Sequence, residues 1–337
     1  MTRLLVTGGC GFIGSNFIHH LFHAVGGAPA ICCPDHGRYG PDPPSDPDLH
    51  IHNLDALTYA GNPAHLTGVD RLKGYRFHHA DIADGAAVDA VVKAAKPEAI
   101  VHFAAESHVD RSIADGVPFA RTNFLGTQVL LNAARRHDVD AFLHVSTDEV
   151  YGSIKAGSFK ETDPFRPGSP YAASKAGADL LAFAHHNTYG LAVAVARCTN
   201  NYGPRQHVEK LLPKLIRQAA RNQPLTLYGT GKNVRDWLYV KDHCAALLHI
   251  LGLQRWGEAW NVAGGNEKTN LEIARHVLTE TGRPENLITH VPDRPGHDGR
   301  YSLDDGKLRA TGWAPRTGFR QGFKETLDWM RGHGGKT

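Results

Sequence analysis

The sequence of 337 residues predicts an α/β protein with a Rossmann-type, doubly wound parallel sheet and a smaller, discontinuous, mixed α/β lobe. Three observations lead to this prediction. Short apolar runs alternate with helix-length segments through residues 1–200, which is the pattern of β-α-β units. A glycine-rich turn joins the first run to the first helix-length segment. Beyond residue 200 the alternation becomes irregular, so we expect residues 201–337 to form mainly the second lobe, with some elements returning to the first domain.

The strands of the first domain are expected where a short strand-like run is bounded by turn residues. These runs cover residues 4–6, 51–54, 75–78, 100–103, 142–145 and 193–196. Helices are expected between them at residues 13–25, 86–95, 119–136 and 172–189. In the second half, helices are expected at residues 208–221, 242–251, 271–281 and 318–330, separated by short strands and turns.

Residues 26–50 interrupt this alternation. The segment contains six prolines and lies between the first helix and the second strand, where roughly two to six residues usually suffice. We expect a mobile surface insertion here, and a lid over the site is the less favoured alternative.

The overall composition excludes several classes of protein. The chain has 37 basic and 34 acidic side chains, a net charge of +3, and no basic run, so a nucleic-acid partner is not expected. The five cysteines are odd in number and lack C-x-x-C spacing, and the 22 histidines are scattered, so neither a disulfide scaffold nor a metal site is expected. The N-terminus lacks the apolar region of a signal peptide, and no apolar stretch approaches ~20 residues, so we expect a cytoplasmic protein without a membrane span.

The glycine-rich turn predicts a dinucleotide site. Glycines allow a tight turn in which backbone N–H groups at a helix N-terminus approach a pyrophosphate. The predicted cofactor residues of the turn are Gly8, Gly11, Phe12, Ile13 and Gly14. Asp55 ends the second strand, where an acidic side chain binds the ribose hydroxyls and repels a 2′-phosphate, so NAD is favoured over NADP. Further contacts are expected after the third and fourth strands, from Asp81 and Ile82 to adenine and from Ala104, Ala105 and Ser107 to the central part of the cofactor.

Two adjacent acidic residues, Asp148 and Glu149, follow the fifth strand and Ser146-Thr147. In an open parallel sheet, ligands bind beyond the carboxyl ends of the strands, so these carboxyls should lie where cofactor and substrate meet. An enzyme that only transfers a hydride does not need them, whereas removal of water requires one neutral and one ionised carboxyl. Two close carboxyls split their pKa values in that sense.

Tyr171 and Lys175 are spaced four residues apart, so they share one face of a predicted helix. A nearby ammonium and an oxidised nicotinamide ring both favour tyrosinate, so we expect the Tyr171 pKa to be lowered and Tyr171 to act as a base.

With these motifs in place, the chain resembles the extended short-chain dehydrogenase/reductase family, most closely its nucleotide-diphosphate-glucose 4,6-dehydratases of the dTDP-glucose type. The resemblance covers nearly the whole chain. It rests on residues 7–14, 57–62, 104–112, 146–152, 169–175, 200–204, 233–237 and 294–298.

This resemblance implies an NAD-dependent reaction on a nucleotide-sugar. Tyr171 takes the proton of the C4 hydroxyl while hydride leaves C4, and Thr147 hydrogen-bonds the same oxygen. Glu149 then removes the C5 proton, protonated Asp148 donates to the departing C6 hydroxyl, and the hydride returns to C6. Lys175, Ser146 and Asn200 are implied around the cofactor. A homodimer is implied as well, because relatives pair through the helices at 119–136 and 172–189.

The resemblance also implies a set of substrate contacts, with Arg235 and Arg294 suited to a diphosphate. The set comprises Ser107, His108, Thr147, Asn201, Glu209, Lys210, Leu211, Thr226, Tyr228, Arg235, Asn261, Arg294 and His297. Thr226 replaces a proline expected in close relatives, which weakens the inference on the nucleobase. Gly299 replaces an expected arginine, which changes only a surface charge.

Four other functions are weighed against this one. A 4-epimerase needs the Tyr-Lys pair and a Ser or Thr but no acid–base pair, and a decarboxylase has no need for Asp148. A 4,6-dehydratase for another nucleotide-sugar, such as UDP-glucose, fits the same residues. A non-catalytic NAD-binding protein should have lost Tyr171, Lys175 or a carboxyl, and none is lost.

Overall fold

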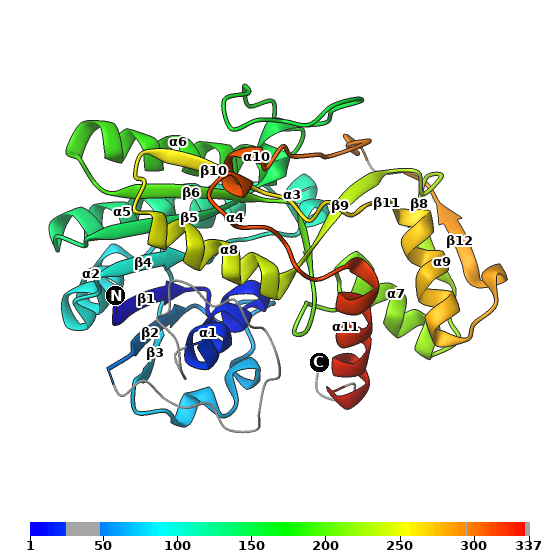
Figure 1. Cartoon of the computed structure of the whole chain (residues 1–337), viewed down its shortest axis with the longest axis horizontal. Helices are drawn as coiled ribbons and strands as arrows, with labels where there is room; N and C mark the ends of the chain where they lie inside the picture. Colours follow the sequence, from blue (N-terminus) through cyan, green and yellow to red (C-terminus); the bar gives the residue numbers. More distant parts are fainter. Residues whose placement is uncertain (25–47, 294, 334–337) are drawn as a thin grey trace.

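The computed structural model describes residues 1–24, 48–293 and 295–333 (Figure 1). The predicted insertion at 26–50 lies outside the described residues except for its last three positions, and Arg294 lies outside them as well. Within the described part of the chain, no helix combines the length and apolar character needed to cross a bilayer.

A seven-stranded parallel sheet forms the centre of the molecule, in the order β10-β6-β5-β4-β1-β2-β3. All six predicted strands are confirmed, with bounds that differ by at most two residues at either end, and the seventh, β10, comes from the second half of the chain. Their bounds are β1 Arg3–Thr7, β2 His50–Asp55, β3 Tyr75–His79, β4 Ala99–His102, β5 Ala141–Thr147, β6 Val193–Cys198 and β10 Glu258–Val262. The strands between the two edges carry buried side chains on both faces, as expected for a doubly wound sheet.

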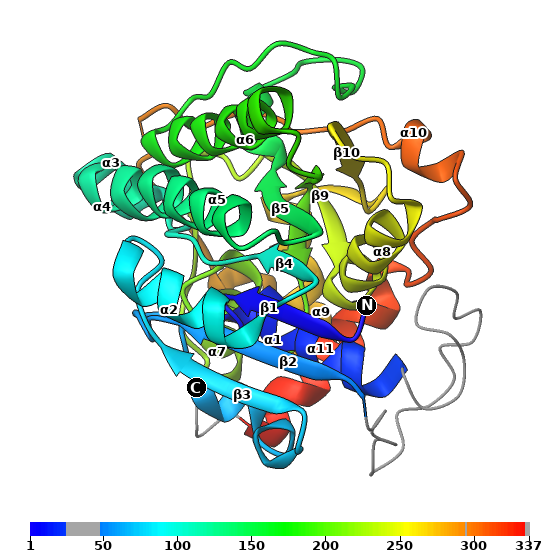
Figure 2. The same cartoon turned by 90° about the vertical axis from the view of Figure 1, so that its left-hand side faces the viewer.

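Helices cover both faces of the sheet (Figure 2). On one face, α1 (Phe12–Ala24) packs beside α8 (Val240–Leu253) over one apolar core. On the other face, α2 (Gly85–Ala95), α5 (Thr127–Arg136) and α6 (Pro170–Tyr189) enclose a second core. The predicted doubly wound architecture is therefore confirmed.

The helix predicted at 119–136 is not one regular α-helix. It consists of α4 (Val117–Phe119), a π-helical segment, η3 (Ala120–Gly126), and α5. Within η3, Asn123 Oδ1 accepts from the Glu106 N–H at 2.9 Å, and its Nδ2 donates to the Glu106 carbonyl at 3.0 Å and to Ser174 Oγ at 2.9 Å. The wider turn thus ties the segment after β4 to α6, and π-turns of this kind are frequent at functional sites.

The second lobe contains two small sheets and three covering helices. One sheet has the order β11-β9-β7, and the other pairs β12 with β8. The strands are β7 Asn200–Tyr202, β8 Leu225–Tyr228, β9 Val234–Tyr239, β11 Glu267–Thr269 and β12 Ile288–Val291. The helices are α7 Leu211–Ala220, α9 Asn270–Thr281 and α11 Phe319–His333, which with α8 confirm the four predicted for this half.

The remaining elements are short. They are η1 Pro63–Leu66, η2 Val69–Arg71, α3 Val109–Ala114, η4 Asp148–Tyr151, η5 Glu285–Leu287 and α10 Gly306–Arg309. One of them, η4, follows β5 directly, so it lies at the carboxyl end of a central strand.

Candidate active site

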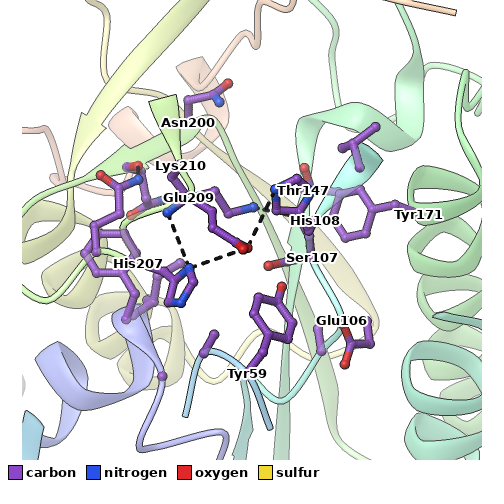
Figure 3. Close-up of a pocket in the computed structure, with 18 of the residues that line it drawn as sticks. Tyr59, Glu106, Ser107, His108, Thr147, Tyr171, Asn200, His207, Glu209 and Lys210 are labelled. Carbon is purple, nitrogen blue, oxygen red and sulfur yellow. Dashed lines mark hydrogen bonds and ion pairs between the residues drawn. The ribbon is translucent and has the colours of Figure 1, made fainter. Parts of the chain in front are cut away.

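A cavity of about 1180 Å³ opens beyond the carboxyl ends of the central strands. The first domain forms one wall, and the second lobe forms the other through the segment before α7 and strands β8 and β9. Figure 3 shows Tyr59, Ser107, Thr147 and Tyr171 around this space, with Lys210 reaching into it from the opposite wall. The cavity therefore lies at the position that the sheet topology predicts for a ligand.

Every predicted cofactor residue lines this cavity. They are Gly8, Gly11, Phe12, Ile13, Gly14, Asp55, Asp81, Ile82, Ala104, Ala105, Ser107, Ser146, Tyr171, Lys175 and Asn200. The glycine turn is too tight for side chains, because a Cβ on Gly14 would lie 2.3 Å from the Gly8 carbonyl oxygen. Gly8 itself has φ +71°, and its Cβ would lie 2.7 Å from Ala104 Cα. The N-terminus of α1 therefore faces the cavity without side-chain obstruction, which fits a pyrophosphate.

The Asp55 carboxyl is held at the edge of the cavity by two backbone groups. Oδ2 accepts from the Cys10 N–H at 2.8 Å, and Oδ1 accepts from the Leu57 N–H at 2.8 Å. Farther along the same wall, Asp81 pairs with Arg121, a lining residue of η3 that the sequence did not single out. Arg121 thus pairs with Asp81 and not with Asp55. The Asp55 carboxyl has backbone N–H groups as its hydrogen-bond partners, which fits a site for ribose hydroxyls.

The turn after β5 presents the two acidic residues to the cavity. Thr147 caps η4, since its Oγ1 accepts from the Glu149 N–H at 3.3 Å and lies 3.2 Å from Asp148 Oδ1. Asp148 is only 3% exposed. Burial raises the pKa of Asp148 well above its usual range, and the Glu149 charge raises it further. Of the two carboxyls, Asp148 is the more deeply buried, so it is the one whose surroundings favour the protonated form.

Tyr171 and Lys175 enter the site from the first turns of α6. Ser169 caps this helix by accepting from the Ala172 N–H, and Pro170 occupies its first position. Contrary to expectation, burial, followed by the Glu149 charge, raises the pKa of Tyr171 well above its usual range. Lys175 Nζ donates to the Val145 carbonyl at 2.7 Å. The groups of the protein alone therefore favour the neutral phenol, because burial and the Glu149 charge both disfavour the phenolate.

Most of the predicted substrate residues line the same cavity. They are Ser107, His108, Thr147, Asn201, Glu209, Lys210, Leu211, Thr226, Tyr228, Arg235 and His297. Lys210 Nζ donates to the Ser107 carbonyl at 2.6 Å, and Glu209 accepts two hydrogen bonds from Arg111 at 2.8 and 2.9 Å. The segment before α7 is thereby tied to the segment after β4, across the mouth of the site.

Arg235 is the buried cation of the second lobe's wall. It is 6% exposed, and its guanidinium lies 4.2 Å from the centre of the Tyr301 ring. Two of its nitrogens donate to the carbonyls of Val234 and Asp298 at 2.8 and 3.1 Å. These contacts fix the plane of the guanidinium, as binding of an anionic group requires.

The structure contradicts the substrate assignment of Asn261, and the assignment of Arg294 falls outside the described residues. Asn261 is fully buried in β10, where Oδ1 accepts from the Tyr151 hydroxyl at 3.0 Å and Nδ2 donates to the Phe159 carbonyl at 2.8 Å. It does not line the cavity, because its side chain turns toward Tyr151. Arg294 lies outside the described residues.

Several lining residues were missed by the sequence reasoning. Asn270, at the start of α9, lines the cavity, and no donor among the described residues reaches its buried Oδ1. Tyr59 lines it as well and stacks under the Arg111 guanidinium at 4.0 Å. Asn270 is the first residue of α9, so an amide side chain at a predicted helix start is the sequence signal that could have identified it. In the described part of the chain, no group of three or more His, Cys, Asp or Glu side chains is placed to hold a metal ion.

Comparisons with known proteins agree with this geometry. The family model described as GDP-mannose 4,6 dehydratase matches residues 46–326. A dTDP-glucose 4,6-dehydratase from Streptomyces niveus is 48% identical over 330 residues, covering 98% of this chain and 93% of that protein. The crystal structure of a dTDP-glucose 4,6-dehydratase from Streptomyces venezuelae with NAD bound has a TM-score of 0.90 at 46% identity, covering 99% of this chain and 98% of that one.

The fold is shared with enzymes of another activity. A UDP-glucose 4-epimerase from Thermus thermophilus in complex with NAD has a TM-score of 0.84 at 32% identity, covering 98% of this chain and 99% of that one. The sheet and the cavity therefore do not by themselves distinguish the two reactions. The family match and the level of identity do, and the chain belongs to the dTDP-glucose 4,6-dehydratases of the extended short-chain dehydrogenase/reductase family.

Proposed function

We propose that this protein is an NAD-dependent dTDP-glucose 4,6-dehydratase that converts dTDP-glucose to dTDP-4-keto-6-deoxyglucose. The observation that carries the proposal is the pair Asp148 and Glu149 at the end of β5, beside Tyr171 and Lys175 in one cavity. Bound NAD would take up the hydride from C4 of the sugar and return it to C6. The glycine turn, the acidic Asp55 wall and the narrow space at Ala104 fit that cofactor.

The protein's side chains would manage the protons of the reaction. Tyr171 accepts the proton of the C4 hydroxyl, and Thr147, which lies beside Asp148, hydrogen-bonds the same oxygen. The resulting 4-keto group acidifies the C5 proton, which Glu149 removes. Asp148, neutral because of its burial, donates a proton to the departing C6 hydroxyl, so that water leaves. One carboxyl is thus ready as acid and the other as base before the substrate arrives.

The acid–base pair also separates this reaction from 4-epimerisation, which needs only the removal and return of hydride at C4. A buried carboxyl that is costly to ionise has no role in such a reaction. The same residues would serve a dehydratase for another nucleotide-sugar such as UDP-glucose. Thr226 and Tyr228, on β8, line the part of the cavity that we assign to the nucleobase.

The direct test is incubation of the purified protein with dTDP-glucose, followed by measurement of the ultraviolet absorbance that 4-keto sugars develop in alkali. We expect a signal that requires both the protein and dTDP-glucose, and a weaker one with UDP-glucose at equal concentration. Absence of a signal with both sugars would refute dehydration, and a stronger signal with UDP-glucose would change the substrate.

Arg235→Lys is expected to weaken substrate binding while leaving most of the chemistry intact. A lysine cannot reproduce the planar, two-pronged contact of a guanidinium with phosphate oxygens. The loss of one charge-assisted hydrogen bond corresponds to about a tenfold to hundredfold increase in KM. Steady-state kinetics would check it, with Arg275→Lys, on the exposed side of α9, as the matched control. A fall in kcat at unchanged KM would contradict the proposed role.

We further propose that the protein is a cytoplasmic homodimer. Apolar side chains stand exposed on neighbouring segments α3, α4, η3 and α6, and dimer interfaces bury such surfaces. They are Ile113, Val117, Phe124, Leu125 and Leu180. Light scattering should give about twice the chain mass of 36.7 kDa. The thiols of Cys10, Cys198 and Cys244 are free, which supports a reducing compartment.

A further inference from the structure

Behind Lys175, on the side away from the cavity, lies a buried polar cluster that the proposed chemistry does not use. Asp179 follows Lys175 by one turn of α6, and its side chain is fully buried. Its Oδ2 accepts from Arg197 Nε at 2.8 Å, and its Oδ1 lies 3.4 Å from His144 Nε2. The same His144 nitrogen lies 3.4 Å from Lys175 Nζ. A continuous chain of polar contacts therefore runs from the ammonium to the Arg197 guanidinium.

On the side of the cluster away from Lys175, further hydrogen bonds hold Arg197. Arg197 is 2% exposed, and its Nη1 donates to the Tyr151 hydroxyl at 2.6 Å and to the Glu161 carbonyl at 3.1 Å. Tyr151 in turn donates to Asn261 Oδ1 at 3.0 Å. Arg197 is thus held in one orientation by groups that do not touch the cavity, and it keeps the Asp179 carboxyl in place.

Among the described residues that act on the Lys175 ammonium, Asp179 is the one carboxylate. Tyr171 and Asp179 lie on the same helix as Lys175. The other titratable or charged groups that face Lys175 or Asp179 are His102 on β4, His144 on β5, and Arg197 and Cys198 on β6. Burial and the Lys175 charge lower the pKa of His144 to about 4, so this ring is neutral. Burial raises the pKa of the Cys198 thiol to about 12. Burial alone would raise the pKa of Asp179, but Arg197 and His144 bring it to about 2.

We propose that Asp179 is a positioning residue of the dehydratase: it is the buried counter-ion that keeps Lys175 charged, with the neutral His144 ring lying between the two charges and Arg197 holding the carboxylate in place. The inference rests on the proposed function, because the charge of Lys175 matters through Tyr171. Asp179 touches neither the cavity nor the predicted substrate, so it acts only through the ammonium.

The consequence concerns the pH at which Lys175 loses its proton. Burial lowers the pKa of Lys175 to about 8, and Asp179 opposes this effect. Activity requires the ammonium, so it falls as the pH rises through that pKa. Loss of the Asp179 charge lowers the pKa further, and the alkaline limb of the kcat profile should move to lower pH. An opposite charge within about 4 to 6 Å shifts a pKa by about one to three units.

The test compares the pH profiles of Asp179→Asn and of the double variant Asp179→Asn with Arg197→Met. The single change leaves a buried guanidinium without its partner, which destabilises the fold. The double change removes both charges together, so that neither is left buried without its partner. In either folded variant we expect the alkaline limb to move down by about one pH unit or more. Asp305→Asn is the matched control, because Asp305 is a buried carboxyl that pairs with an arginine Nε at 2.7 Å outside the cavity.

A second readout does not depend on turnover. The ¹³Cε resonance of Lys175, identified as the signal lost in Lys175→Arg, titrates with the lysine itself and can be followed without cofactor or substrate. We expect its midpoint to fall in the double variant and to stay unchanged in Asp305→Asn. A midpoint that does not move would refute the role of Asp179. A midpoint that falls while the wild-type protein shows no dehydratase activity would instead overturn the proposed function and leave the counter-ion role standing.

Discussion

Glu149→Gln is expected to leave the enzyme able to oxidise its substrate but unable to release product. A glutamine keeps the size and hydrogen-bonding shape of the side chain, but it cannot take the C5 proton. Loss of a general base costs about 10²- to 10⁴-fold in rate. The variant should therefore bind NAD, transfer the hydride from C4 and accumulate NADH on the protein. Stopped-flow absorbance of NADH, together with the keto-sugar assay, would follow the two half-reactions separately.

The matched control for this variant is Glu161→Gln, since Glu161 accepts from the Asn261 N–H at 2.9 Å outside the cavity. It should reduce activity only slightly. Normal turnover of Glu149→Gln would show that another group removes the C5 proton. Exchange of the C5 proton with deuterated water offers an independent check, because it should stop in Glu149→Gln even where NADH forms.

Tyr171→Phe is expected to block the reaction earlier, before any NADH appears. The protein's own groups raise the pKa of Tyr171, so the phenolate is disfavoured in the protein alone. Tyr171 is expected to act as a base only in the assembled site, where the Lys175 ammonium and an oxidised cofactor add positive charge. Without its hydroxyl, residue 171 cannot accept the proton of the C4 hydroxyl, and we assign no other group to that step. Both NADH formation and keto-sugar formation should fall by about 10²- to 10⁴-fold.

Binding measurements separate this effect from a loss of structure. Tyr171 is 9% exposed and its ring packs edge-on against Phe119, so phenylalanine should keep the packing. Calorimetric affinity for dTDP should change little, and the thermal midpoint should shift by only a few degrees. NADH formation at the normal rate in Tyr171→Phe would remove Tyr171 from its assigned role.

Much of the first domain could be predicted because its signals are local. Strands β1 to β6 are short strand-like runs between turn residues, and the glycine turn can only be tight, since Gly14 has no room for a Cβ. The two carboxyls were found because a parallel sheet brings the ends of its strands to one edge. These features depend on neighbours in the sequence, and sequence reasoning captured them.

What could not be predicted depends on contacts between distant segments. β10 reads Glu-Ala-Trp-Asn-Val, and only its pairing with β6 makes it part of the main sheet. That pairing turns Asn261 toward Tyr151 and leaves Asn270 to face the cavity. The π-turn at Ala120–Gly126 likewise arises from Asn123, whose partners lie 17 and 51 residues away in the sequence. The raised Tyr171 pKa reflects carboxyls and burial that helical spacing alone does not reveal.

The position of β10 also bears on how the chain folds during its synthesis. β10 completes the sheet at the β6 edge, yet it emerges from the ribosome 60 residues after that strand ends. Until then β6 presents an uncovered row of backbone donors and acceptors, and such edges recruit other chains. A truncated protein that ends before Glu258 still contains the glycine turn, both carboxyls, Tyr171 and Lys175. We expect it to aggregate rather than to form a working half, because its last central strand lacks a neighbour.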